Sequence, residues 1–171
     1  MGFTRCLACA SVAATLCGGS IASAQSSAPA DAACADAHFL IGEWEVKTGD
    51  GRLAAEVVFE AGADDCYVME TWEGRLDGIP DWYALVTYSG ETKNWGYLAA
   101  SSNPGGLRLR YEDGTMHGEE FRFSTAELAN GQGRFSYFKL PDGRLRELSV
   151  LSSDDGKTWE TEYEFFWQRK N

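Results

Sequence analysis

Hydrophobic and polar residues alternate along most of this chain from Gly42 onward, in short runs separated by glycine-containing turns. The clearest run lies near the end of the chain, where mostly aromatic residues alternate with glutamates. The first set is Trp159, Thr161, Tyr163, Phe165 and Trp167, and the second is Glu160, Glu162 and Glu164. A two-residue period places the first set on one face of a β-strand and the acidic set on the opposite face. The pattern predicts antiparallel strands with one buried face and one solvated face.

Five Asp-Gly pairs separate the alternating runs: Asp50-Gly51, Asp77-Gly78, Asp113-Gly114, Asp142-Gly143 and Asp155-Gly156. Both residue types tolerate the positive φ of tight hairpin turns. Ten strands are predicted, at Gly42–Thr48, Leu53–Glu60, Cys66–Glu73, Trp82–Tyr88, Lys93–Ala100, Leu107–Glu112, Thr115–Ser124, Gly133–Leu140, Arg144–Ser152 and Thr158–Arg169. A short helical turn is expected at Asp36–Ile41. Because a long antiparallel meander has exposed edges unless it closes, we expect an all-β fold, a closed up-and-down barrel of eight to ten strands.

The first 24 residues have the pattern of a secretory signal peptide. Arg5 precedes the apolar segment Cys6–Leu16, and Ala22-Ser23-Ala24 has the small residues that signal peptidase requires, so cleavage is expected before Gln25. The apolar segment is too short to span a bilayer, and no stable membrane anchor is predicted. Residues 25–35 are expected to form a flexible linker, and residues 36–171 a single domain. These features predict export to the periplasm or the extracellular space.

Charge and cysteine content narrow the possible partners. The chain has 15 basic and 26 acidic residues and a formal net charge of −11, which argues against nucleic acid as a partner. Of the five cysteines, only Cys34 and Cys66 follow the predicted cleavage site. A cysteine pair in an oxidising compartment predicts a disulfide, and two free buried thiols are the alternative.

The segment Phe39–Val46 contains Gly42-x-Trp44 after the predicted helical turn and resembles the opening signature of the calycin superfamily, which includes the lipocalins and fatty-acid-binding proteins. The resemblance implies a lipocalin-like barrel in which a basic residue from near the chain end, here Arg169, packs across Trp44. The wider pattern is similar to a family of small exported bacterial proteins with a lipocalin-like barrel. That likeness depends on the cysteine and histidine before Gly42, on the strand that Cys66 opens, and on the runs Pro141–Leu145 and Ser153–Trp159. It implies the barrel and the disulfide but no particular activity.

Motifs with established chemistry are few. The segment Ser152–Trp159 resembles the Asp-box hairpin of sialidase propellers, where the aspartate has a structural role, and a single copy does not predict a propeller. His38 and His117 are the only histidines and have no metal-binding spacing, so neither a metal nor a cofactor is expected. We expect His38 to pack or cap beside Cys34 and His117 to be exposed. Carboxylates are numerous, but no motif singles out a catalytic pair.

Aromatic residues on one parity of their strands suggest a binding cavity for a small molecule. The candidate ligand contacts are Trp82, Trp95, Tyr97, Tyr111 and Tyr137. The leading hypothesis is therefore a barrel that binds a small neutral or cationic hydrophobic molecule. Two alternatives stay open: an enzyme of the isomerase, dehydratase or cyclase type built in the same cavity, and a structural or protein-interaction module whose aromatics only fill the core. The sequence predicts no oligomeric state.

Overall fold

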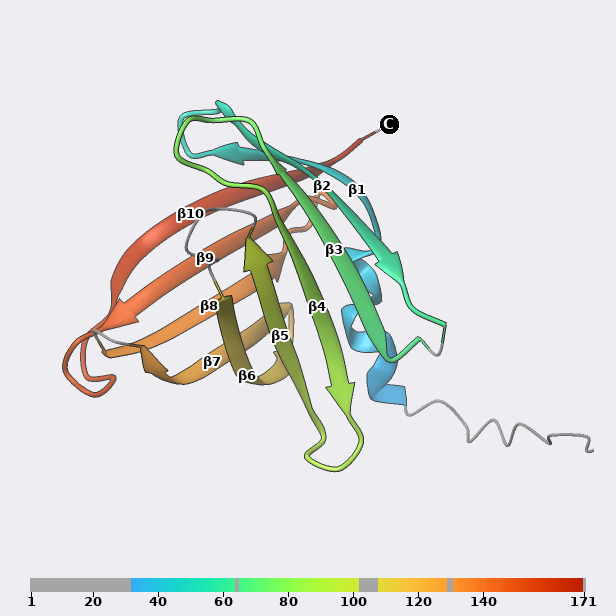
Figure 1. The fold of residues 1–171 in the computed structure, drawn as a ribbon, viewed down its shortest axis with the longest axis vertical. Coiled ribbons are helices and arrows are strands. Elements are labelled where there is room, and N and C mark those ends of the chain that lie inside the picture. Colours follow the sequence, from blue (N-terminus) through green and yellow to red (C-terminus); the bar gives the residue numbers. More distant parts are fainter. Residues whose placement is uncertain (1–31, 64, 102–107, 129–130, 171) are drawn as a thin grey trace, which may run out of the picture.

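The computed structural model describes residues 32–63, 65–101, 108–128 and 131–170, and these residues form a closed antiparallel barrel (Figure 1). Each strand pairs with its neighbours in sequence, and the last strand pairs with the first, which completes the predicted up-and-down barrel. The elements are the 3₁₀ helix η1 (Ala32–Leu40) and the strands β1 (Gly42–Thr48), β2 (Leu53–Ala61), β3 (Tyr67–Gly74), β4 (Trp82–Ser89), β5 (Asn94–Ser101), β6 (Arg108–His117), β7 (Glu120–Leu128), β8 (Gly131–Lys139), β9 (Leu145–Ser152) and β10 (Glu160–Arg169).

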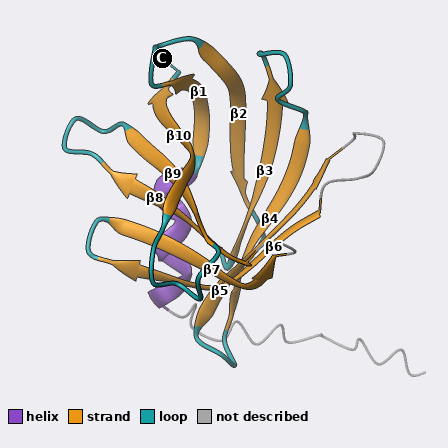
Figure 2. Cartoon of the chain, turned by 90° about the vertical axis from the view of Figure 1, so that its left-hand side faces the viewer, coloured by secondary structure: helices purple, strands orange, loops and turns teal. Residues whose placement is uncertain are grey.

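The helix η1 lies against one end of the barrel, as Figures 1 and 2 show, and we call this the closed end. Ala37 and Leu40 of η1 are fully buried in the core, and the Phe39 ring packs edge-on against Phe121 of β7. The helix begins at Ala32 and so includes the last four residues of the expected linker. The expected signal peptide and residues 25–31 lie outside the described residues.

Trp44 and Arg169 meet at the closed end, as the calycin resemblance implied. The guanidinium of Arg169 lies 4.3 Å from the centre of the Trp44 ring and donates hydrogen bonds to the carbonyls of Phe39 and Ile41. Trp44 Nε1 donates to the Leu40 carbonyl at 2.7 Å. Gly42 is required here because a Cβ would lie 2.4 Å from Arg169 Nη1, and because its φ is +129°. The packing of Arg169 across Trp44 is therefore confirmed.

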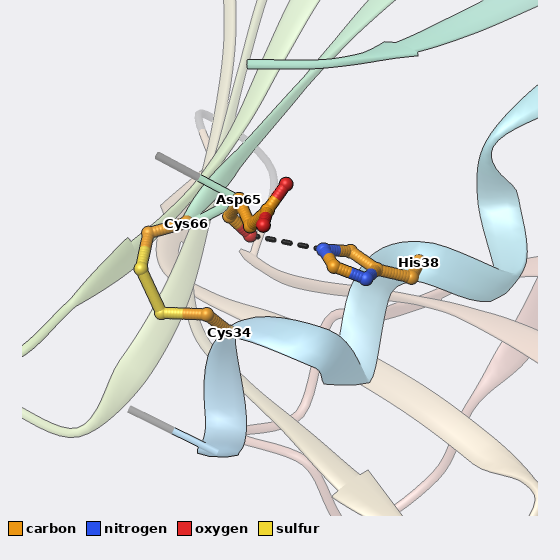
Figure 3. The surroundings of a disulfide bond; sticks show 4 residues. All are labelled: Cys34, His38, Asp65 and Cys66. Atoms are coloured by element: carbon orange, nitrogen blue, oxygen red, sulfur yellow. Dashed lines mark hydrogen bonds between the residues drawn. A yellow bond between two sulfur atoms is a disulfide. The ribbon is translucent and has the colours of Figure 1, made fainter. Parts of the chain in front are cut away.

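A disulfide joins η1 to the start of β3 (Figure 3). The sulfur atoms of Cys34 and Cys66 are 1.97 Å apart, which confirms the predicted bond and excludes the free-thiol alternative. His38 lies beside this disulfide, and its Nε2 donates to the Asp65 carbonyl at 3.1 Å. His38 thus ties the helix to the β2–β3 connection, in agreement with the expected structural role.

One predicted turn is wrong. Asp113-Gly114 lies inside β6, where the register shifts against both neighbouring strands, and the hairpin turn comes instead at Gly118, with a φ of +65°. Gly114 is buried, and a Cβ there would lie 2.5 Å from the Phe123 ring and 2.8 Å from Trp95 Cβ. The glycine therefore allows close packing at a β-bulge, with Asp113 in the positive-φ conformation.

The β9–β10 turn has the structure expected of an Asp-box hairpin. Asp154 accepts hydrogen bonds from the Thr158 backbone and hydroxyl and from the Ser152 hydroxyl, and these bonds lower the pKa of Asp154 to about 2.

In β10 the predicted alternation is interrupted by a register shift between Thr161 and Tyr163. The shift lets the Glu162 carboxylate reach Ser149, so Glu162 does not simply belong to the solvated column.

Candidate functional site

The barrel has a second end, opposite η1, which we call the open end. The connections β1–β2, β3–β4 and β9–β10 lie there, because each strand that starts at the closed end finishes at the open end. The inner-facing side chains Trp82, Tyr163 and Phe165 lie near this end and keep partial exposure. Near η1, Trp95 and Phe121 are buried, whereas Tyr88 keeps partial exposure. Partial exposure at the open end shows that solvent reaches inner side chains there.

Glu70 projects from the middle of β3 into the barrel with only 1% of its surface exposed. Its side chain follows the inner parity of β3, between Val68 and Trp72. Tyr97 Oη donates to Glu70 Oε2 at 2.8 Å, and Trp82 Nε1 donates to Oε1 at 3.2 Å. Both donors are neutral, so the Glu70 carboxyl is hydrogen-bonded but has no cationic partner among the described residues.

Glu147 repeats this arrangement on β9, with 5% of its surface exposed. Its two oxygens accept hydrogen bonds from Tyr163 Oη at 3.2 Å and from Trp167 Nε1 at 3.0 Å. Each inner carboxyl thus contacts one tyrosine hydroxyl and one tryptophan N–H. Ser149, two residues further along β9, hydrogen-bonds Glu162, which brings a third carboxylate to the inner face near the open end.

Burial shifts the protonation of this cluster. It raises the pKa of Glu70 from 4.5 to about 7, although the bonds from Tyr97 and Trp82 oppose the rise. Burial and repulsion by Glu70 raise the pKa of Glu147 to about 8. Burial and the nearby glutamates also raise the pKa of Tyr97 and Tyr163 well above 10, so these phenols remain hydrogen-bond donors at neutral pH.

Aromatic rings connect the two carboxyls. Trp72 stacks on Trp82 with ring centres 4.0 Å apart, and it contacts Trp167 at 5.6 Å and Phe165 at 5.9 Å. Trp82 donates to Glu70, and Trp167 donates to Glu147. The Trp72 N–H is buried and has no hydrogen-bond acceptor among the described residues. This cluster of Trp72, Trp82, Trp167 and Phe165 with the two glutamates is the candidate site.

The five predicted ligand contacts all face the barrel interior, but they do not form one site. Trp82 and Tyr97 touch Glu70 directly. Tyr137 lies against Trp167, and Tyr111 packs against Tyr97 and Phe135. Trp95 lies at the closed end, where it contacts Phe121 and Tyr88, away from the two carboxyls. The inner orientation of the five is thus established, and ligand contact remains a prediction.

No sequence motif singles out Glu70 or Glu147. Their positions carried a signal, because each replaces an apolar residue on the inner parity of its strand: Val68-x-Glu70-x-Trp72 and Leu145-x-Glu147-x-Ser149. Trp72 and Trp167 were also missed as members of one cluster, since their contact depends on closure of the barrel. His117 is exposed, as expected, and its Nε2 lies 2.8 Å from the Thr115 hydroxyl.

The outer face of β3–β5 carries exposed apolar side chains. Met69, Leu85 and Leu98 are cross-strand neighbours in register, and Tyr83 on the same strand as Leu85 is 65% exposed. An open, shallow pocket of about 340 Å³ lies between Leu85, Leu98 and Arg110. Exposed apolar surfaces of this kind are typical of contacts with other molecules. Tyr111 and Tyr97, whose hydroxyl donates to Glu70, also line this pocket.

Within residues 32–63, 65–101, 108–128 and 131–170, no group of three or more histidine, cysteine, aspartate or glutamate side chains is arranged to hold a metal ion. No helix in the same ranges is long and apolar enough to cross a membrane. Comparisons with models of known protein families and with curated proteins find no match to this chain.

Proposed function

We propose that this protein binds a compact, ring-containing small molecule, neutral or cationic, in the open half of its barrel. The observation that carries the proposal is the inner cluster, in which each of two buried carboxyls contacts a tryptophan and a tyrosine, and in which Trp82 and Phe165 are partly exposed. A binding site needs apolar walls with a few polar groups that fix orientation, and the cluster supplies both. A ten-stranded barrel is also wider than the eight-stranded barrels whose interiors side chains just fill.

The chemistry of the walls favours rings over long chains and disfavours anions. Indole and phenol rings offer flat stacking surfaces with polar edges, which suit an aromatic or alicyclic ligand better than a fatty acyl chain. The Trp72 N–H offers an unused donor to a ligand oxygen or nitrogen. Two inner carboxyls and a net charge of −11 repel an anionic ligand during approach and in the site.

A metabolite screen on the mature protein tests the proposal by melting temperature and tryptophan fluorescence. We expect ring-containing compounds that raise the melting temperature and quench the fluorescence, because the indoles line the site. Trp82→Ala should abolish both responses. Tyr83→Ala is the matched control, since Tyr83 is the next residue on β4 and points outward. The proposal fails if no compound binds, or if both variants respond as the wild type does.

An enzyme with acid–base chemistry is the second candidate. The observation that favours it is that each inner carboxyl contacts a tyrosine hydroxyl and has a pKa of about 7 or 8, near the value that suits a general acid or base. Mass spectrometry of a bound compound after prolonged incubation would distinguish the two functions. A change in the compound that Glu70→Gln or Glu147→Gln abolishes, with binding retained, would establish catalysis.

We also propose that the chain is exported and belongs with the exported lipocalin-like proteins that its sequence resembles. The disulfide between Cys34 and Cys66 supports an oxidising compartment. Intact-mass analysis of protein from the native host should give a chain that begins at Gln25 and weighs two hydrogens less than the reduced form. A chain that retains the first 24 residues would refute export by this signal.

A further inference from the structure

We propose that Glu70 and Glu147 act together as the counter-ion for an organic cation, a ring-bearing ammonium, and that this cation displaces a proton from the pair when it binds. The inference rests on the proposed function and names the ligand class of that same site.

The two carboxyls approach the site from well-separated walls. Glu70 lies on β3 and Glu147 on β9, and β2, β1 and β10 separate these strands along the shorter way around the barrel. The aromatic cluster lies between them, because Trp82 joins Glu70 to Trp72, and Trp72 in turn contacts Trp167, which binds Glu147. A ligand among these rings would therefore lie between two acidic groups.

No described basic side chain compensates the two carboxyls. Their hydrogen-bond donors are a phenol and an indole each, all neutral. Ion pairs such as Arg122–Glu120 and Arg146–Glu164 join outward-facing residues. A buried carboxylate without a cation is costly, so its charge must be neutralised by a proton or by a positively charged ligand.

The aromatic rings of the site, like its carboxyls, can bind an ammonium group. The faces of indole and phenyl rings attract cations, and aromatic cages are a common means of binding quaternary ammonium groups. Trp82 and Phe165 are the partly exposed rings of the cluster that can offer such faces, and Tyr163 packs against Phe165 at 5.1 Å. An ammonium carried on a ring would stack on the indoles while its charge faces the glutamates. The negative net charge of the protein favours its approach.

Proton release follows from the titratable groups that surround the pair. These groups are the Tyr97 phenol on β5, Tyr111 on β6, Tyr137 on β8, Tyr163 on β10 and the Glu162 carboxylate on β10, besides the two glutamates themselves. The phenols stay neutral because burial raises the pKa of each of them. The pair Glu70 and Glu147 therefore holds the exchangeable protons. Binding exchanges a protonated carboxyl and a free ammonium for a carboxylate–ammonium pair and a released proton, so the affinity for a cation rises with pH.

Three probes of similar size test the charge preference by isothermal titration calorimetry on the mature, disulfide-bonded protein: 2-phenylethylammonium, 2-phenylethanol and phenylacetate. At pH 8.5 the ammonium should bind at least about tenfold more tightly than the alcohol, and phenylacetate should not bind. The inference is overturned if the alcohol or the acid binds as tightly as the ammonium, in which case the proposed function survives. If none of the three binds, the inference fails as well, and the metabolite screen separately decides the proposed function.

Benzyltrimethylammonium, whose charge does not depend on pH, tests the proton exchange. Its affinity should rise at least about tenfold from pH 5.5 to pH 8.5, and near neutral pH its binding heat should differ between phosphate and Tris because a proton is released to the buffer. An affinity that is constant across this range would overturn the inference.

Substitutions test whether Glu70 and Glu147 cause the pH dependence and the charge preference of binding. Glu70→Gln and Glu147→Gln should each reduce the rise in affinity with pH and the preference for the ammonium over the alcohol. Glu73→Gln, which alters an exposed carboxylate on the same strand as Glu70, should leave both unchanged. Full pH dependence in both inner variants would overturn the inference. Should an inner variant not fold, the wild-type pH series and the buffer comparison decide the question alone.

Discussion

Substitution of Glu70 by glutamine should make the protein more stable at alkaline pH. In the wild type, burial raises the pKa of Glu70 from 4.5 to about 7, so the folded state holds this proton more tightly than the unfolded state does. The stabilisation is complete below pH 4.5 and is lost as the pH rises through about 7. At 1.4 kcal/mol for each tenfold change in proton affinity, the loss is about 3 kcal/mol. The glutamine side chain keeps the shape of the neutral acid and does not titrate.

Urea denaturation followed by tryptophan fluorescence measures this effect, with the disulfide intact, at pH values from 4.5 to 8.5. We expect Glu70→Gln and wild type to have free energies of unfolding within about 1 kcal/mol of each other at pH 4.5. At pH 8.5 the variant should be more stable by about 3 kcal/mol. Because the Glu70 charge also raises the pKa of Glu147, the substitution should lower the pH at which Glu147 titrates.

Two features keep this measurement specific. Glu73→Gln is the matched control, since Glu73 lies three residues further along β3 and its exposed carboxylate bonds Arg75 outside the barrel. Carboxyls with a lowered pKa affect stability in a different, more acidic pH range. The hydrogen bonds to Asp154, whose pKa is about 2, stabilise the fold above pH 3.8, and this stabilisation is lost as the pH falls below that value. If Glu70→Gln were no more stable than wild type at pH 8.5, or if Glu73→Gln gave the same gain, the assignment of Glu70 as a buried proton-binding group would be refuted.

Three further predictions concern the scaffold, each measured as a change in the free energy of unfolding by urea. Replacing either Cys34 or Cys66 by Ala should cost about 2 to 5 kcal/mol, because the bond closes a long loop and anchors η1; an unchanged stability would show that the helix docks without it. Trp44→Ala should cost about 3 to 5 kcal/mol, since the ring is 1% exposed, and a near-neutral result would contradict its role at the closed end. Gly114→Ala should cost about 1 to 3 kcal/mol through overpacking against the Phe123 and Trp95 side chains, and an unchanged stability would show that the bulge relaxes freely.

Much of the fold could be predicted because its signals are local. The alternation of apolar and polar residues placed Trp82, Tyr97 and Tyr137 on the inner face without knowledge of any long-range contact. The Cys34–Cys66 bond followed from the number of cysteines and from the oxidising compartment that the signal peptide predicts. The prediction of a hairpin turn at Asp113-Gly114 was wrong because the same dipeptide is equally suited to a hairpin turn and to a β-bulge. Only the crowding around Gly114 by Phe123 and Trp95, which comes from other strands, distinguishes the two.

The candidate site was harder to predict because it depends on barrel closure. An inner-parity glutamate is visible in the sequence, but Glu70 and Glu147 lie 77 residues apart in sequence, a separation across which no spacing rule applies. Their relation exists only once β1 pairs with β10 and Trp72 meets Trp167. A strong pKa perturbation is likewise a property of the surroundings and not of the residue. The alternation along each strand could therefore show that Glu70 and Glu147 point inward, but not that they belong to one site.

The cost of the pair is itself an argument about function. Burying a carboxyl without a cationic partner costs free energy, so the fold does not need two inner carboxyls to which the described residues bring no cation. A purely structural barrel would gain stability from apolar residues at positions 70 and 147. The disulfide, the buried helix η1 and the packing of Arg169 across Trp44 strengthen the closed end. The molecule thus combines a reinforced closed end with a destabilising acidic pair inside the barrel, and this combination is expected of a scaffold whose interior serves a ligand.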